Sequence, residues 1–240
     1  MGLSRAALYN GRVAGSTTLY TRCRVMGRSV FATLPILLLT VAASMSAQEP
    51  ALHQADYYPL KVGHQWTYRA GTDRVVVKVE KQVTLEFKRD EKAKSETAIG
   101  FQVRIISGQG ETTEQVAVLD DGVYRFATAG KAIKPPLRFF KLGQGALEWA
   151  VDSRTEDGKP ITGKFVLGTE AIALTVNGEK IYTYTSTCKQ LLIGDKEMAI
   201  TYWFAKEDLK KKEPGGLVKQ HIRIGKQDIT LELEEFKAGP

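Results

Sequence analysis

The chain has 240 residues, of which 43% are hydrophobic and 25% are charged, and its formal net charge is +7. All five basic residues before Gln48 are arginines and no acid precedes that position, so the rest of the chain carries 29 basic against 27 acidic residues, a formal charge of +2. A nucleic-acid-binding protein is expected to carry a basic patch or stripe. The near balance therefore argues against nucleic acid as a partner.

An apolar segment near the N-terminus has the features of a secretory signal. The fourteen residues VFATLPILLLTVAA (30–43) follow Arg28 and precede the small residues of SMSAQ, which is the basic, apolar, small-residue order of an export signal. A membrane-spanning helix needs about 20 apolar residues. We therefore predict a signal segment with a helix over residues 1–47, and a periplasmic or secreted protein after cleavage. The alternative is an uncleaved N-terminal helix that anchors the chain to the membrane.

The residues before Met26 are unusual for a signal. They include four arginines and no acid, whereas MGRSVFATLPILLL, which begins at Met26, already forms a complete signal with a short basic head. We hypothesise that translation starts at Met26 rather than at Met1.

Residues 48–240 are predicted to form a single β-rich domain. They are numerous enough to bury a substantial core. Cys188 is their only cysteine, which excludes an intramolecular disulfide, and we expect this thiol to be buried. Pro135 and Pro136 cannot donate hydrogen bonds to a central sheet, so they are predicted to mark a sheet edge or a crossover.

Alternating apolar and polar residues dominate this domain. In the stretches 83–87, 200–204 and 229–233 every second residue is apolar. This period-two pattern is typical of half-buried strands. Within 200–204 the alternation places Tyr202 and Trp203 on opposite faces of the strand.

Turn signals separate the expected strands. Asn177-Gly178 can adopt the positive φ angles of a two-residue type I′ turn, and Asp121-Gly122 is a similar signal. The segments LLIGDKEMAI and IRIGKQDITL contain two more tight connections. Successive hairpins favour an antiparallel meander. The predicted fold class is therefore all-β or nearly so, with a single antiparallel meander sheet curled into a half-barrel or sandwich.

The stretch YYPLKVGHQWTYR (57–69) introduces the first expected strand. Pro59 fixes its own φ and favours extended geometry before it, and Gly63 allows a sharp turn. Trp66 and Tyr68 then share one face of the strand, where each ring can bury about 150–250 Å². Two interpretations stay open: the rings cap one end of the core, or they line a concave ligand surface.

This stretch resembles the start of a family of uncharacterised, exported bacterial β-rich proteins. In that family a signal peptide is followed by tyrosine or phenylalanine, then Pro-Leu, then Gly-x-x-Trp-x-Tyr. The corresponding residues here are Tyr58, Pro59, Leu60, Gly63, Trp66 and Tyr68.

The resemblance extends to the C-terminal part of the chain. The family has a tyrosine-tryptophan strand, a Gly-Leu-Val-Lys element and a last strand ending near LEEF, which correspond to Tyr202 and Trp203, to 216–219 and to 233–236. This chain departs from the pattern by inserting KEDLKKKEP (206–214) before the Gly-Leu-Val-Lys element. By analogy of fold, the resemblance implies a similarity to periplasmic half-barrels that shield lipid or lipoprotein acyl chains.

The sequence carries no catalytic, metal-binding or cofactor-binding motif. His53, His64 and His221 have no His or Cys at a zinc-like spacing, and the chain contains no H-E-x-x-H, G-x-S-x-G or C-x-x-C motif. Paired carboxylates could act as general acid and base, but the sequence singles out no pair. We therefore predict no catalytic residue, no metal site and no cofactor, and a hydrolase is the least favoured function.

The favoured function is a non-enzymatic protein that binds or carries a hydrophobic ligand such as a lipid. A curved antiparallel sheet could present a concave face lined by the tryptophan-bearing strands, and each buried methylene of a bound chain would contribute about 0.8 kcal/mol. The alternative is a structural or interaction protein of the cell envelope, with a filled core and an envelope protein as its partner. The candidate ligand-binding residues are Trp66, Tyr68, Trp149, Tyr202 and Trp203.

Overall fold

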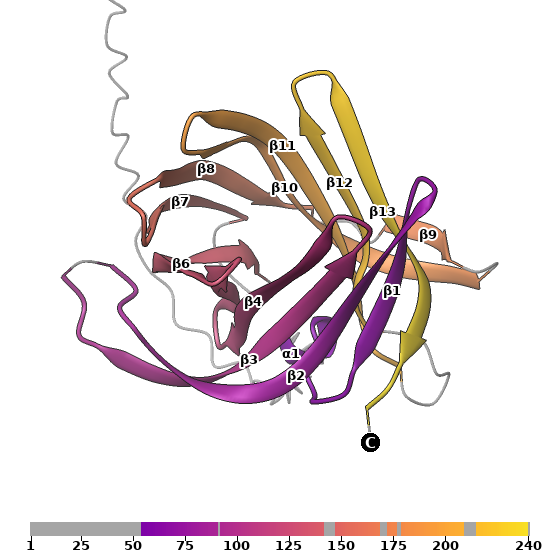
Figure 1. Cartoon of the computed structure of the whole chain (residues 1–240), viewed down its shortest axis with the longest axis horizontal. Coiled ribbons are helices and arrows are strands. Elements are labelled where there is room, and N and C mark those ends of the chain that lie inside the picture. The colour runs from indigo at the N-terminus through magenta and orange to yellow at the C-terminus, as the bar shows by residue number, and fades with distance from the viewer. Residues whose placement is uncertain are drawn as a thin grey trace, which may run out of the picture. The chain divides into compact units, whose positions relative to one another are not determined.

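The computed structural model describes residues 54–90, 92–141, 147–168, 172–176, 179–208 and 215–239. Within these ranges the chain forms one short helix and thirteen strands, which confirms the predicted all-β class (Figure 1). The predicted signal segment 1–47, its helix and the hypothetical start at Met26 lie outside the described residues.

A four-residue helix, α1 (Gln54–Tyr57), precedes the strands. The strands are β1 (Gln65–Ala70), β2 (Asp73–Phe87), β3 (Glu96–Ser107), β4 (Gly110–Leu119), β5 (Gly122–Thr128), β6 (Lys131–Phe140), β7 (Glu148–Thr155), β8 (Pro160–Leu167), β9 (Ile172–Val176), β10 (Glu179–Ile193), β11 (Lys196–Ala205), β12 (Gly216–Ile224) and β13 (Gln227–Lys237). Two-residue connections join β4 to β5, β10 to β11 and β12 to β13, since the residues on either side of each connection pair directly. Val176 likewise pairs with Glu179, as the predicted hairpin at 177–178 requires.

The strands form one continuous antiparallel sheet that closes on itself. Strands β1 to β8 follow one another in order, β10 pairs with β8, and β11, β12 and β13 lead back to β1. Because β10 also pairs with β11, the described strands other than β9 form a closed barrel of twelve. β9 pairs with the first part of β10. The antiparallel meander is confirmed, whereas the predicted half-barrel or sandwich is wrong because the first and last strands pair.

Long, bulged strands explain why the sheet closes. β2 and β10 each span 15 residues, and their registers shift between Val79 and Lys81 and between Cys188 and Leu191. An extra residue in one strand bends it and increases its twist, and strand tilt and stagger set the size of a barrel. The barrel is closed where β1 pairs with β13.

Aromatic side chains close the barrel at the end where α1 lies. The ring centroids of Phe140 and Phe204, both fully buried, are 4.0 Å apart. The Tyr57 ring lies 6.3 Å from Phe140, and the Tyr58 ring lies 5.9 Å from Phe204. The turns that join β1 to β2 and β12 to β13 lie at the opposite end, above α1 in Figure 1. We call this opposite end the turn end.

Strands β6 and β7 form the weakest seam of the barrel. Only Ile133 and Lys134 of β6 pair with β7, and the prolines 135 and 136 follow at the point where pairing stops. Beyond these prolines, a side-chain hydrogen bond links the two strands in place of backbone pairing: Trp149 Nε1 donates to Arg138 O at 2.8 Å. Pro135 and Pro136 therefore stand at a break in pairing within the ring rather than at an edge of the sheet.

The far part of the β2–β3 hairpin folds over the outside of β4 and β5. Its side chains form a small second apolar cluster, in which the Phe87 and Phe126 rings meet edge to face at 5.1 Å. Leu85 packs closely over Gly100, where an added Cβ would overlap its side chain. The far part of this hairpin brings Arg89 next to Asp121 on the outer surface near β6, where Arg89 Nη1 lies 2.8 Å from Asp121 Oδ1.

Candidate functional site

The barrel encloses a cavity of about 310 Å³ that its own side chains leave unfilled. Pockets that bind small ligands range from about 300 to 1,000 Å³, and most of their lining is apolar. The lining here is of the same kind, because thirteen of its twenty residues are aliphatic residues, methionine or phenylalanine. The lining residues are Tyr58, Trp66, Tyr68, Val75, Val77, Val103, Ile105, Glu114, Arg125, Leu137, Phe139, Leu191, Ile193, Met198, Ile200, Tyr202, Leu217, Gln220, Ile222 and Leu231.

The cavity runs from the aromatic end of the barrel toward the turn end. Tyr58, which follows α1, lines it at the aromatic end. At the turn end its lining consists of half-buried apolar side chains close to the hairpin turns, which we call the turn-end rim. The turn-end rim comprises Val75, Ile105, Ile193, Met198, Ile222 and Leu231. Since these side chains remain partly accessible, the turn end is one place where a molecule could enter.

Trp66 and Tyr68 are held in the wall by bonds to the β12 backbone. Trp66 Nε1 donates to Gly215 O at 2.9 Å, and the Tyr68 hydroxyl donates to Leu217 O at 2.8 Å. Gly216 has a φ of 101°, and a Cβ on it would lie 3.3 Å from Trp66 Nε1. The Trp-x-Tyr and Gly-Leu-Val-Lys segments therefore meet in space. With their polar atoms satisfied by the backbone, both rings present apolar surface to the cavity.

An ion pair interrupts this apolar wall. Arg125 Nε donates to Glu114 Oε2 at 2.9 Å, and the guanidinium lies 5.0 Å from the centroid of the Phe139 ring. Only 21% of the Arg125 side chain and 15% of the Glu114 side chain are exposed. Thr128 Oγ1 donates a longer bond, 3.4 Å, to the second Glu114 oxygen. A buried pair of this kind is strongly unfavourable to break, because either partner alone would be an uncompensated charge.

The tyrosines around the ion pair keep their protons at neutral pH. Burial raises the pKa of Tyr58 and of Tyr202 above the ordinary value. In Tyr202 the nearby Arg125 guanidinium, which hydrogen-bonds the hydroxyl, opposes part of this rise. Burial acts to lower the pKa of Arg125, but Glu114 together with Tyr202 and Tyr58 outweighs this effect and raises that pKa above its usual range. The cluster therefore consists of one cation, one anion and neutral hydroxyls.

The structure places three of the five candidate residues in the cavity wall: Trp66, Tyr68 and Tyr202. Trp149 is buried but does not line the cavity, because its indole stacks on Phe165 at 5.6 Å and fills the wall beside the β6–β7 seam. Trp203 lies on the outer face, half-buried under Lys219, whose Nζ is 5.8 Å from the ring centroid. The alternation along β11 that brings Tyr202 inward excludes Trp203 from the lumen.

Among the lining residues that the sequence analysis did not single out, Glu114 and Arg125 are the charged ones. A signal for them exists: Arg125 follows Val123 by two positions in β5, and Glu114 precedes Val116 by two in β4. Both valines are buried, with exposed fractions of 0% and 1%. A charged residue in the inward phase of an alternating strand therefore marks a buried polar group.

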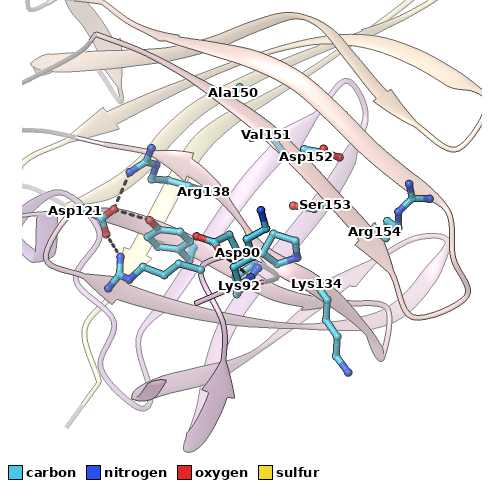
Figure 2. A pocket seen from close by; sticks show the side chains of 14 residues that line it. Asp90, Lys92, Asp121, Lys134, Arg138, Ala150, Val151, Asp152, Ser153 and Arg154 are labelled. Atoms are coloured by element: carbon cyan, nitrogen blue, oxygen red, sulfur yellow. Dashed lines mark hydrogen bonds and ion pairs between the residues drawn. The ribbon is translucent and has the colours of Figure 1, made fainter. Parts of the chain in front are cut away.

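A second hollow of about 750 Å³ lies outside the barrel, between the β2–β3 loop and the strands β6 and β7 (Figure 2). Asp121 accepts bonds from Arg89 and Arg138, both at 2.8 Å, and from the Tyr124 hydroxyl at 2.7 Å. Burial acts to raise the pKa of Asp121, but these donors outweigh it and lower that pKa. Five basic and three acidic residues line this hollow, in contrast to the apolar lumen. The lumen is therefore the candidate site for an apolar ligand.

The two described histidines contact protein groups, and the described cysteine is buried. His64 Nδ1 lies 3.0 Å from Pro59 O, and His221 Nε2 lies 3.0 Å from Asp228 Oδ1. Cys188 is fully buried, as expected, and burial raises the pKa of its thiol. No group of three or more His, Cys, Asp or Glu side chains among the described residues is arranged to hold a metal ion. Nor does any described helix have the length and hydropathy needed to cross a membrane.

Comparisons with known proteins assign no family to this chain. No protein-family model and no curated protein sequence matches the chain. One solved structure is similar, that of a "putative exported protein with YmcC-like fold" from Bacteroides fragilis. It is 10% identical, the alignment covers 76% of this chain and 99% of that one, and the TM-score is 0.43.

Proposed function

We propose that this protein binds or carries an apolar, chain-like molecule such as a lipid, without catalysing a reaction on it. The unfilled lumen of about 310 Å³ with its apolar lining is the observation that carries this proposal. It supports a binding function over the alternative of an envelope interaction protein, since that alternative predicts an interior filled by side chains.

The size of the cavity suits a short chain or one segment of a longer chain. At about 30 Å³ per water-sized group, 310 Å³ has room for about ten methylenes. Each buried methylene contributes about 0.8 kcal/mol, so ten contribute about 8 kcal/mol before the entropic losses of binding. This is enough to retain a chain during transit while still allowing its release.

The proposed place of action is the periplasm or the cell exterior. The basic, apolar and small-residue order of 28–47 supports export. An apolar molecule outside the cytoplasm has to cross an aqueous space, and a closed barrel with an accessible turn end would shield it from water.

Two measurements test the proposal. Native mass spectrometry of protein purified without detergent should detect a co-purified lipid, or a complex once lipid is added. In a matched pair of variants, Val77→Trp places an indole into the lumen, whereas Lys78→Trp places one on the exposed outer face of the same strand. Only Val77→Trp should abolish binding of an apolar fluorescent probe. Equal binding by both variants, or the absence of any lipid complex, would rule out the lumen as the site.

A further inference from the structure

The polar side chains in the lumen wall indicate what kind of head group the ligand carries. Building on the proposed binding function, we infer that the ligand is a neutral amphiphile. Its uncharged, hydrogen-bonding head binds beside Glu114 and Arg125, and its apolar tail extends toward the turn-end rim.

The position of the Glu114–Arg125 ion pair determines which end of the lumen the ligand's head group would occupy. Glu114 and Arg125 are the charged side chains among the described residues that line the cavity. Arg125 covers the Phe139 ring at 5.0 Å, and the Tyr58 ring meets that same phenylalanine edge-on at 5.9 Å. The polar group therefore sits toward the aromatic end of the lumen. The turn-end rim consists of aliphatic side chains and one methionine, with the neutral amide of Gln220 opposite Leu231 as a nearby polar lining group. A tail therefore meets mainly apolar surface there, whereas the charged hydrogen-bonding groups lie at Glu114 and Arg125.

The charge balance of the cluster favours an uncharged head. Glu114 and Arg125 neutralise each other at 2.9 Å, and the Tyr58 and Tyr202 hydroxyls carry no charge at neutral pH. A carboxylate head would bring an unmatched negative charge next to Glu114, and an ammonium head would bring an unmatched positive charge next to Arg125. An unpaired charge in an apolar interior is strongly unfavourable. An alcohol, ester or amide avoids this penalty.

The same cluster offers both kinds of hydrogen-bonding partner that such a head needs. A guanidinium has five N–H donors, and the Nε donor of Arg125 is directed at Glu114. The carboxylate of Glu114 can accept from a hydroxyl or an amide N–H, and the Tyr202 hydroxyl can donate or accept. A hydroxyl or amide head can thus bond to the cluster without breaking the ion pair, and those bonds to charged groups are stronger than bonds between neutral ones.

Packing of the barrel does not require the Glu114–Arg125 ion pair. Replacing a buried ion pair by apolar residues of similar volume is often neutral or stabilising. The adjacent inward positions on the same two strands are occupied by Val116 and Val123, both buried. Apolar residues would therefore serve at 114 and 125 if the lumen took a hydrocarbon alone.

Three ligands of equal tail length test the head-group assignment: 1-decanol, decanoate and decylammonium. Each is titrated near neutral pH against protein loaded with the uncharged probe N-phenyl-1-naphthylamine, and its dissociation constant is obtained from probe displacement. Wild-type protein should bind decanol at least about tenfold more tightly than either ion, because each ion brings an unmatched charge into the apolar lumen. Tighter binding of decanoate or decylammonium would overturn the inference.

The double variant Glu114→Leu/Arg125→Met removes the cluster and keeps the side-chain volumes similar. It should still bind the probe, with an affinity measured separately for this variant, and lose about tenfold in decanol affinity. The control is Arg69→Met/Glu232→Leu, which removes an exposed ion pair of 3.1 Å on the outer surface and should change neither value. Tyr202→Phe, which keeps the ring and removes one hydroxyl, should lower decanol affinity by a smaller factor and provides the same test if the double variant does not fold.

The outcomes separate the two proposals. If the cluster variants bind decanol as tightly as wild type does, the head-group assignment is wrong and the apolar lumen site stands. If neither the probe nor any of the three ligands binds wild-type protein in displacement or in direct calorimetry, both proposals are wrong.

Discussion

The Trp66→Phe substitution removes a side-chain donor that ties β1 to the start of β12. Trp66 Nε1 donates to Gly215 O at 2.9 Å, and this bond reaches across β13, which lies between the two strands in the sheet. The Trp66 side chain is only 4% exposed. Phenylalanine keeps an aromatic ring in the wall but leaves the Gly215 carbonyl without this donor and leaves part of the indole site empty.

The expected loss of stability is about 2–4 kcal/mol. A buried carbonyl that loses its donor costs about 1–3 kcal/mol, and the smaller ring adds about 1 kcal/mol for the unfilled volume. Trp203→Phe is the matched control, because it makes the same chemical change on the outer face, where the indole is half-buried under Lys219. Its expected loss is below about 1 kcal/mol.

Equilibrium unfolding in urea, followed by far-UV circular dichroism, measures both losses. The free energy of unfolding is obtained by linear extrapolation, and an unchanged m-value shows that the difference lies in stability rather than in compactness. If Trp66→Phe and Trp203→Phe destabilise the protein equally, the bond to Gly215 does not hold β1 against β12. The account of how the Trp-x-Tyr and Gly-Leu-Val-Lys segments meet would then be wrong.

Three further substitutions and reactions probe other parts of the structure. Cys188 is fully buried with a raised thiol pKa, so Ellman's reagent should modify it only after unfolding; rapid modification of native protein would contradict this burial. Lys131 lowers the pKa of Asp157 to about 2, so Asp157 contributes stability that is present above its unfolded pKa near 4 and lost as pH falls through 2. The destabilisation caused by Asp157→Asn in urea melts at pH 6 should therefore shrink as the pH is lowered from about 4 through 2, and a constant effect of the substitution over this range would contradict the ion pair. Trp149→Phe removes the donor to Arg138 O at the β6–β7 seam and should cost about 1–3 kcal/mol, with faster amide exchange in β6 and β7; unchanged exchange there would show that the indole does not hold the seam.

The strands and turns can be predicted from the sequence, but the closure of the sheet into a barrel cannot. Alternation shows that one face of each strand is buried, and that pattern is identical in an open half-barrel and in a closed ring. The pairing of β1 with β13, in which Trp66 stands opposite Phe236, joins residues at the two ends of the domain. The register shifts in β2 and β10 depend on local twist, which the sequence pattern does not display.

The candidate site was predictable in part, for the same reason. Period-two alternation correctly separates Tyr202 from Trp203, but it does not show which of the two faces encloses a cavity. It also cannot distinguish an inward ring that lines a void from one that fills it, and Trp149 fills the wall against Phe165. Arg125 does not stand out in the sequence because a charged residue on an alternating strand ordinarily faces solvent, whereas its phase relative to Val123 places it in the lumen.

The unfilled lumen supports the proposal that the barrel binds a ligand. The aromatic end shows that this chain can pack rings closely, with Phe140 and Phe204 at 4.0 Å. Departures from close packing are expected at functional sites. Filling the lumen with Val77→Trp should therefore abolish binding without a loss of stability, whereas a variant that unfolds more readily would show that the lumen is already as full as its packing allows.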